Sequence, residues 1–296
     1  MEITEYHPFK SVEAKEKFLK MYDSAAMWWP VPSETRMVDT SFGKTFVRIS
    51  GPDDAPPLAL LHGMSSNSMT WLTHIEALSK NYRTYAVDSI YDFGRSIYTK
   101  IPKDSNDFVN WLDELFNALD LGNCINLVGM SYGGWQTSQY ALKFPERLNK
   151  IVLMAPAATV QPISSGWIIR AFLAAIPHEY FFKSFMRWIF EDYVKKDNET
   201  AEKVIDGVVL ALKCFKTRRA PNPTVLDDNE LKSIKVPALF LVGENEKLYP
   251  AEKALQRLNT AVPQIKTELI HEAGHDLIIV QSEMVNKKIL EFLDEK

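Results

Sequence analysis

Ser131 stands between glycines at the end of an apolar run, in the sequence INLVGMSYGGW that covers residues 125–135. A strand that ends in Gly-x-Ser-x-Gly and continues into a helix makes a tight turn, because side chains larger than glycine would collide with the neighbouring strand and helix. The turn exposes the serine hydroxyl, and the N-terminus of the helix favours negative charge at that point. We therefore predict that Ser131 is a nucleophile. The alternative is that Ser131 only caps the helix.

A serine nucleophile needs a base, and His275 is the histidine whose position fits this role. It lies in HEAGHDL (271–277), after the last expected strand, where the base falls when the chain order is serine, acid, histidine. His271 is expected within or at the end of that strand, and we interpret it as structural. His62 precedes Gly63 in a different element. Three further histidines have no supporting context: His7, His74 and His178.

The acid that orients the base is expected in the loop VGENEKLYP (242–250), after the penultimate strand. The related pattern Gly-x-x-Asp-x-x-x-Pro matches GENEKLYP with the acid on Glu246, so Glu takes the place of the commoner Asp. Glu244 in the same loop is the second candidate. Asp276 is the third, because adjacent residues rarely present their side chains to each other in this way. No Asp or Glu occurs between residues 148 and 177, so the acid cannot follow the preceding strand.

Two backbone N–H groups are expected to bind the oxyanion that forms during acyl transfer. One belongs to Tyr132, the residue after the nucleophile. The other belongs to Met64, which follows a His-Gly pair in LALLHGM (58–64). His62 is then expected to brace this loop. The alternative is that HGM is an ordinary turn after a strand.

Short apolar runs alternate with helical patterns along most of the chain, which predicts a parallel sheet covered by helices. Two antiparallel strands, TRMVDT and KTFVRIS, are expected before this series and make the sheet mixed. The fold class is therefore α/β. The expected strands of the series are LALLHG (58–63), TYAVD (84–88), INLVG (125–129), KIVLMAP (150–156), ALFLVGE (238–244) and TELIHEAGH (267–275).

The alternation stops at residues 157–235, where the patterns are helical. A loop of this length without structure of its own would be uncommon, so we predict a helical cap inserted after the sixth strand. The core then consists of residues 1–156 and 236–296, with an N-terminal helical extension at residues 1–34. The aromatic side chains of the cap are expected to pack against the core, and a few of them together to line a substrate pocket. They are Trp167, Phe172, Tyr180, Phe181, Phe182, Phe185, Trp188 and Phe190.

Composition and charge argue against several kinds of partner. With 34 Lys and Arg against 38 Asp and Glu, the net charge of −4 gives no electrostatic reason to expect nucleic acid or an anionic membrane. No apolar stretch is long enough for a membrane span, and the N-terminus lacks the pattern of a signal peptide. Two cysteines in 296 residues indicate free thiols, so a cytoplasmic location is expected. No HExxH or CxxC motif suggests a metal, and no cofactor is expected.

The chain resembles the α/β-hydrolase superfamily, and its closer features, including the N-terminal helix and WWPVP (28–32), resemble small bacterial carboxylesterases of Bacillus type. Dehalogenases and epoxide hydrolases resemble the fold but carry Asp at the elbow, where this chain has Ser131. The turn DSIYDFGRS departs from the family pattern, because Tyr91 and Asp92 stand where relatives often have Pro or Gly. The matching segments are LALLHGM (58–64), VDSIYDFGRS (87–96), LVGMSYGGW (127–135), LVGENEKLYP (241–250) and HEAGHDL (271–277).

The resemblance implies a cofactor-independent carboxylesterase that acts on a small-molecule ester. Ser131 would attack the acyl carbon, His275 would take its proton and later activate water, and Glu246 would orient the imidazole. The same residues could instead hydrolyse a lactone, a thioester or a carbon–carbon bond, or form a peroxyacid. The fold could also serve a ligand sensor or regulatory protein without catalysis. The sequence leaves open whether the apolar cap helices form a contact between copies of the chain, as in a homo-oligomer.

Overall fold

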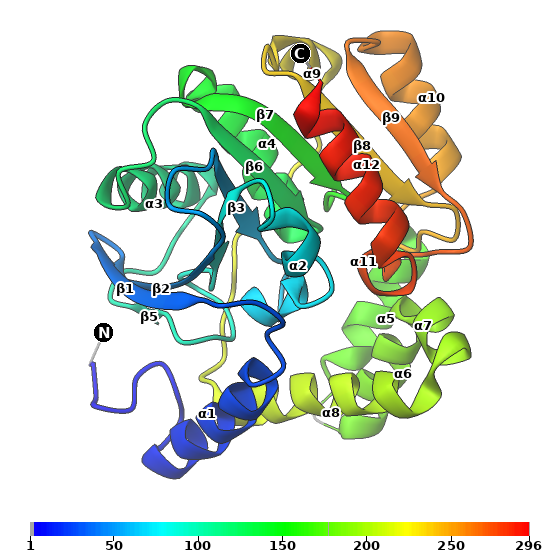
Figure 1. The fold of residues 1–296 in the computed structure, drawn as a ribbon. Coiled ribbons are helices and arrows are strands. Elements are labelled where there is room, and N and C mark those ends of the chain that lie inside the picture. The colour runs from blue at the N-terminus through cyan, green and yellow to red at the C-terminus, as the bar shows by residue number, and fades with distance from the viewer. Residues whose placement is uncertain (1–2, 177, 296) are drawn as a thin grey trace.

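The computed structural model describes residues 3–176 and 178–295, in which strands and helices alternate over most of the chain (Figure 1). The strands are β1 (Glu34–Thr40), β2 (Gly43–Ser50), β3 (Pro57–Leu61), β4 (Arg83–Val87), β5 (Ile97–Tyr98), β6 (Ile125–Met130), β7 (Leu148–Met154), β8 (Ala238–Gly243) and β9 (Ile265–Ile270). The α-helices are α1 (Val12–Ala26), α2 (Ile75–Leu78), α3 (Ser105–Ala118), α4 (Tyr132–Lys143), α5 (Ser165–Ala174), α6 (Glu179–Ile189), α7 (Glu191–Lys196), α8 (Asn198–Cys214), α9 (Asp228–Ser233), α10 (Ala251–Ala261), α11 (Leu277–Val280) and α12 (Ser282–Asp294). Two 3-10 turns are η1 (Ser68–Trp71) and η2 (Pro145–Arg147).

All of these strands join one mixed sheet, in the order β1-β2-β4-β3-β6-β7-β8-β9, with β5 paired to β2. The strands β4, β3, β6, β7, β8 and β9 are parallel to their neighbours in this series, whereas β1 and β2 form an antiparallel hairpin. Leu61 of β3 lies beside Gly129 of β6, so the carboxyl ends of these two strands meet at one edge of the sheet. Ligand sites of open α/β sheets lie at this edge. The expected α/β class is confirmed.

Helices cover both faces of the sheet, which explains the continuous apolar runs of its strands. Along β3, Leu58 and Leu60 pack in one core with residues of α2 and α12. Ala59 and Leu61 pack in the other core with residues of α3 and α4. Because successive side chains of a strand point to opposite faces, a strand covered on both sides needs apolar residues at every position.

Residues 157–235 connect β7 to β8 through the helices α5 to α9, and we call this segment the insertion. In Figure 1 its helices α5 to α8 lie beyond the arrowheads of β7 and β9, and the N-terminal helix α1 contacts α8. The insertion follows the sixth strand expected from the sequence. It follows β7 in the structure because the two-residue strand β5 is too short to leave an apolar pattern.

Two helical patterns that are continuous in the sequence are each divided in the structure. The pattern EYFFKSFMRWIFEDYV breaks at Phe190, between α6 and α7, and the C-terminal pattern breaks at Gln281, between α11 and α12. Phe190 has φ −98° and ψ 35°, and Gln281 has φ −126° and ψ 35°, both outside the helical region. Apolar spacing continues across a single non-helical residue, so periodicity cannot reveal it. No helix in the described part of the chain is both long and apolar enough to cross a membrane.

Candidate active site

Ser131 occupies the turn between β6 and α4 in a backbone conformation that residues with a side chain rarely adopt. Its φ is 53° and its ψ is −114°. Its N–H donates to the carbonyl oxygen of Met154 at 2.8 Å, and its carbonyl oxygen accepts from the N–H of Ala157 at 2.9 Å. The serine side chain makes no capping hydrogen bond to α4. This geometry argues against the interpretation of Ser131 as a helix cap.

The glycines around the serine allow three elements to approach closely. A Cβ atom on Gly129 would lie 2.2 Å from the carbonyl oxygen of Gly133. A Cβ atom on Gly133 would lie 2.4 Å from the carbonyl oxygen of Leu61 in β3. Because both gaps are too short for a carbon atom, a side chain at either position would push β3, β6 and α4 apart.

Three side chains from three loops at the carboxyl end of the sheet form a chain of hydrogen bonds. Ser131 follows β6, Glu246 follows β8 and His275 follows β9. Nε2 of His275 lies 2.9 Å from Oγ of Ser131, and Nδ1 lies 3.1 and 3.0 Å from Oε1 and Oε2 of Glu246. The structure therefore brings together the residues that the sequence predicts as nucleophile, base and acid. This arrangement can activate a hydroxyl through an oriented imidazole.

The carboxylate of Glu246 is held by its own loop. Its Oε1 accepts the N–H of Lys247 at 2.7 Å and the N–H of Leu248 at 2.8 Å. The side chain is 0% exposed, and a buried carboxylate is tolerated only where donors satisfy it. Both oxygens lie within 3.1 Å of Nδ1 of His275, and the two backbone donors bind Oε1.

Opposing effects determine the pKa of His275. Burial disfavours the imidazolium and by itself lowers the pKa. The negative charge of Glu246, its hydrogen bond and a smaller contribution from Asp276 outweigh burial, so the pKa of His275 is raised above its ordinary value. The site therefore favours the protonated form of His275, which is the form that it would take as a base for Ser131.

Glu244, the second acid candidate, and His271, interpreted as structural, lie together at the surface. The carboxylate of Glu244 accepts the N–H of Glu272 at 3.2 Å and lies 3.4 Å from Nδ1 of His271. The side chain of His271 is 74% exposed, directly after the end of β9. Neither contact involves the serine. Within residues 3–176 and 178–295, no three His, Cys, Asp or Glu side chains are grouped so that they could hold a metal ion.

The loop after β3 lies against the serine. A Cβ atom on Gly63 would be 3.2 Å from Cβ of Ser131 and 3.8 Å from its Oγ. Met64 follows Gly63 in this loop. Tyr132 is the first residue of α4, a position where the backbone N–H has no acceptor within the helix. Of the two predicted oxyanion residues, Tyr132 directly follows Ser131, and Met64 directly follows Gly63, which lies against Ser131. They come from two different elements.

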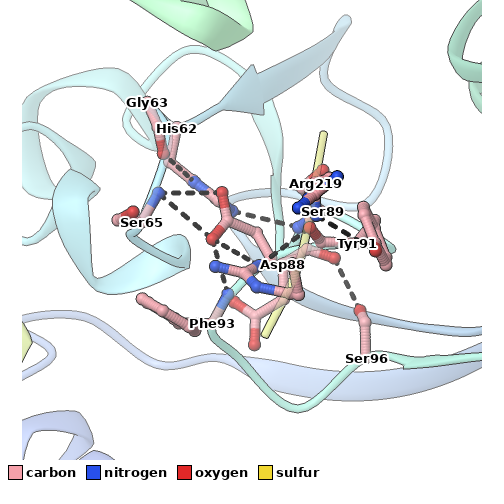
Figure 2. A network of polar contacts seen from close by, with 11 residues as sticks. His62, Gly63, Ser65, Asp88, Ser89, Tyr91, Phe93, Ser96 and Arg219 are labelled. Carbon is pink, nitrogen blue, oxygen red and sulfur yellow. Dashed lines mark hydrogen bonds and ion pairs between the residues drawn. The ribbon is translucent and has the colours of Figure 1, made fainter. Parts of the chain in front are cut away.

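His62 connects this loop to the loop after β4, in agreement with the predicted bracing role (Figure 2). Its Nε2 accepts the N–H of Ser89 at 3.0 Å, and its Nδ1 lies 2.7 Å from the carbonyl oxygen of Gly63. The ring proton is therefore on Nδ1. Because both ring nitrogens are engaged by backbone groups, His62 is not available as a base for Ser131.

A cavity of about 200 Å³ has both Met64 and Tyr132 in its wall. Residues 212–220 of the insertion form part of its lining, but none of the eight aromatic side chains considered in the sequence does so. Two of those eight, Phe172 and Tyr180, are instead exposed. No sequence pattern marks residues 212–220 as cavity lining, because they form a helix end and an irregular segment. The other lining residues are Ser65, Ser89, Tyr91, Asp92, Phe93 and Phe108.

The start of α7 connects the insertion to the two loops that carry Glu246 and His275, the predicted acid and base. The contacts are Lys247 with Glu191 at 2.8 Å, Asn245 with Asp192 at 3.0 Å, and Asp276 with the N–H of Tyr193 at 2.7 Å. Hydrogen bonds from Lys195 and Lys247 lower the pKa of Glu191 to about 2, so this carboxylate is ionised at neutral pH. Asp276, the third acid candidate, is therefore used to hold α7, and burial raises its pKa.

The fold and the arrangement at the carboxyl end of the sheet define the class of protein. Residues 58–287 match the alpha/beta hydrolase family, and the chain belongs to this family.

Within this family, the chain is similar to carboxylesterases of Bacillus subtilis. Carboxylesterase YbfK of Bacillus subtilis (strain 168) is 36% identical over 287 residues, which cover 96% of this chain and 96% of that protein. The crystal structure of naproxen esterase (carboxylesterase NP) from Bacillus subtilis matches with a TM-score of 0.87 and 32% identity, over 96% of this chain and 100% of that chain. The enol-lactonase from Burkholderia xenovorans LB400, at 21% identity, shares the fold with a TM-score of 0.70 over 88% of this chain and 100% of that chain. The predicted resemblance to carboxylesterases of Bacillus type is confirmed.

Proposed function

We propose that the chain is a carboxylesterase that hydrolyses small hydrophobic esters, with Ser131, His275 and Glu246 as its catalytic triad. The observation that carries this proposal is the 2.9 Å contact between Oγ of Ser131 and Nε2 of His275. A hydroxyl becomes an effective nucleophile when an adjacent base takes its proton. The 36% identity to a carboxylesterase over 96% of the chain supports the ester as substrate.

In the acylation step, Oγ of Ser131 attacks the acyl carbon while Nε2 of His275 takes its proton. The N–H groups of Met64 and Tyr132 donate to the oxyanion of the tetrahedral intermediate. The imidazolium then protonates the alcohol oxygen, which leaves, and the acyl group remains on the serine.

In the deacylation step, His275 takes a proton from water, and the hydroxide attacks the acyl carbon. The same two N–H groups bind the second oxyanion, and the proton returns to Oγ of Ser131 as the acid leaves. Glu246 keeps the imidazole in the tautomer that can accept a proton at Nε2 and stabilises its cation in both steps.

The insertion acts as a cap in this proposal, since its residues 212–220 contribute to the lining of the cavity that has Met64 and Tyr132 in its wall. A volume of about 200 Å³ is below the usual range for drug-sized ligands, so we expect a small acyl or alcohol group there. The apolar side chains that would contact it are Phe93, Phe108, Leu212 and Phe215.

We also propose a cytoplasmic location. Cys124 and Cys214 are both free, and free thiols persist where the compartment is reducing. Fractionation of the producing cells, with the protein detected by antibody, tests this location. Recovery in an extracellular or membrane fraction would contradict it.

Turnover of 4-nitrophenyl butyrate by the purified protein tests the proposed function. We expect hydrolysis by the wild type and a loss of several orders of magnitude in Ser131→Ala, which removes the nucleophile but leaves the oxyanion site. A fluorophosphonate should label Ser131 and no other serine. Binding of small ligands without turnover of any ester would favour a sensor, and labelling of Ser131→Ala would place the nucleophile elsewhere. Lactones and thioesters in the same panel compare the alternative acyl substrates.

A further inference from the structure

We infer that Asp92 and Arg218 are positioning residues for this reaction. Asp92 holds the turn that carries Met64, and Arg218 cancels the charge of Asp92 beside the oxyanion. The inference rests on the proposed function, because it needs an oxyanion bound by the N–H of Met64.

The carboxylate of Asp92 accepts backbone N–H groups from two loops. The N–H of Ser65, in the loop after β3, lies 3.1 and 3.0 Å from its two oxygens. The N–H of Phe93, in the loop after β4, donates to Oδ1 at 2.7 Å. Figure 2 shows Ser65 and Phe93 on this network. Asp92 therefore fastens the oxyanion loop to its neighbour at a second point, in addition to the contact made by His62.

Ser65 is where this loop needs to be held. It directly follows Met64 and has a φ of 63°, a conformation that residues other than glycine rarely adopt unless their surroundings impose it. The N–H bound by Asp92 belongs to the peptide that joins Met64 to Ser65. This peptide shares Cα of Met64 with the peptide that carries the N–H of Met64, so the contact with Asp92 restrains the backbone on one side of the oxyanion donor.

A carboxylate at this place would repel the oxyanion if it stayed unpaired. Asp92 lines the same cavity as Met64 and Tyr132, and its side chain is 8% exposed, so solvent screens its charge poorly. Burial and, next, the charge of Asp92 raise the pKa of the Tyr132 phenol. The field of Asp92 thus reaches the residue that supplies the other oxyanion N–H.

Arg218 of the insertion provides the compensating charge. Its Nη1 donates to Oδ1 of Asp92 at 2.8 Å and to the carbonyl oxygen of Tyr91 at 2.8 Å. The guanidinium lies 3.8 Å from the centre of the Phe93 ring, and its side chain is 10% exposed. Buried ion pairs seldom add stability beyond that of apolar side chains, because desolvation offsets their attraction. Positioning of the loop that carries Met64 explains why the buried ion pair of Asp92 and Arg218 lies beside this loop.

The test compares Arg218→Met, Arg218→Lys, Asp92→Asn and the double variant Asp92→Asn with Arg218→Met. Hydrolysis by the wild type and its loss in Ser131→Ala are established first, so that failure of the proposed function is recognised separately. The matched control is Arg147→Met, which breaks another poorly exposed ion pair, that of Arg147 with Asp113. For each variant, kcat and KM are normalised by fluorophosphonate titration. The Ki of phenylboronic acid, which binds the serine as a tetrahedral anion, and Tm are also measured.

We expect Arg218→Met to lower kcat at least about tenfold and to leave KM within about twofold of wild type. The Ki of phenylboronic acid should rise by about the same factor as kcat falls, because the oxyanion exists only in the transition state and its analogue. Asp92→Asn added to Arg218→Met should raise kcat again by about threefold or more, since it removes the uncompensated charge and keeps an oxygen for Ser65. Arg218→Lys should stay within about threefold of wild type. The control should lower Tm and leave kcat unchanged.

The inference is overturned if Arg218→Met keeps the wild-type kcat and Ki, or if the double variant is slower than Arg218→Met. It is also overturned if KM rises while kcat is unchanged, because Arg218 would then bind substrate. If Arg218→Met does not fold, Arg218→Gln, which keeps an N–H donor without the charge, is judged by the same criteria.

Discussion

Replacement of Glu246 by glutamine should hold His275 in the wrong tautomer. The backbone N–H groups of Lys247 and Leu248 bind Oε1 at 2.7 and 2.8 Å, and in the variant they would bind the amide oxygen. The amide nitrogen then takes the place of Oε2, 3.0 Å from Nδ1 of His275. An amide N–H cannot accept from Nδ1–H, and the amide oxygen at the place of Oε1, 3.1 Å from Nδ1, is already bound by two backbone donors. The amide therefore favours the tautomer with its proton on Nε2, which can no longer take the proton of Ser131.

The expected loss in kcat is about 10⁴, the size found when the acid of a serine protease triad is changed to its amide. This corresponds to about 5 kcal/mol of transition-state stabilisation. We expect the full loss here for two reasons. The backbone donors fix the orientation of the amide, and the substitution removes the charge that raises the pKa of His275. Glu246→Asp keeps the charge but shortens the reach by one carbon, so its loss should be smaller.

The assay is hydrolysis of 4-nitrophenyl butyrate by protein whose folded fraction is checked by thermal melting. Glu244→Gln is the matched control, because this carboxylate lies in the same loop but is 48% exposed. It should keep kcat within about twofold, as substitutions of exposed side chains usually do little. The reasoning is refuted if Glu246→Gln retains more than about a tenth of the wild-type kcat, or if Glu244→Gln is the crippling change.

Three further predictions concern the base and the elbow. Only a neutral His275 can accept a proton, and its pKa is raised, so kcat/KM should increase with pH through a midpoint above about 6.5. A lower midpoint in a profile measured from pH 5 to 9 would contradict the role of Glu246. His275→Ala should match Ser131→Ala in kcat within about tenfold, because the losses in kcat from single triad substitutions do not add. His271→Ala should change kcat little, because this side chain is exposed, and the opposite pattern in the ester assay would make His271 the base. Gly133→Ala should lower Tm by several degrees and kcat at least about tenfold, because its Cβ would lie 2.4 Å from the carbonyl oxygen of Leu61. An unchanged melting curve and kcat would show that the turn around Ser131 tolerates a side chain at this position.

Much of the fold and the residues of the candidate site could be predicted because their signals are local. Continuous apolar runs followed from burial on both faces of the sheet, and the glycines next to Ser131 followed from the close contact of three elements. Glu246 and His275 could be assigned because each follows a recognisable strand. The loop pattern favoured Glu246 over Glu244, and the structure places Glu246, rather than Glu244, against His275.

Contacts between distant, irregular segments could not be predicted. Arg218 lies in a segment without periodicity and meets Asp92 across 126 positions of the chain. In the sequence, Asp92 stands out only as a departure from the usual turn, because a carboxylate that accepts backbone N–H groups has no pattern in sequence. The cavity lining was expected among aromatic helical residues, yet residues 212–220 provide it. Which end of a helical insertion faces a site depends on packing that single-sequence patterns do not encode.

The attachment of α7 to the loops that carry Glu246 and His275 limits how this enzyme could be redesigned. A chimera that exchanges residues 157–235 as a block would replace Glu191 and Asp192, whose partners Lys247 and Asn245 would stay behind in the recipient chain. Such grafts should express as folded proteins with poor turnover. A mutational library aimed at substrate range should therefore leave residues 191–193 unchanged and vary Leu212, Phe215 and Thr217 in the cavity wall. The cavity-lining end of the insertion can therefore be changed for new specificity, provided that residues 191–193 at its other end keep their native sequence.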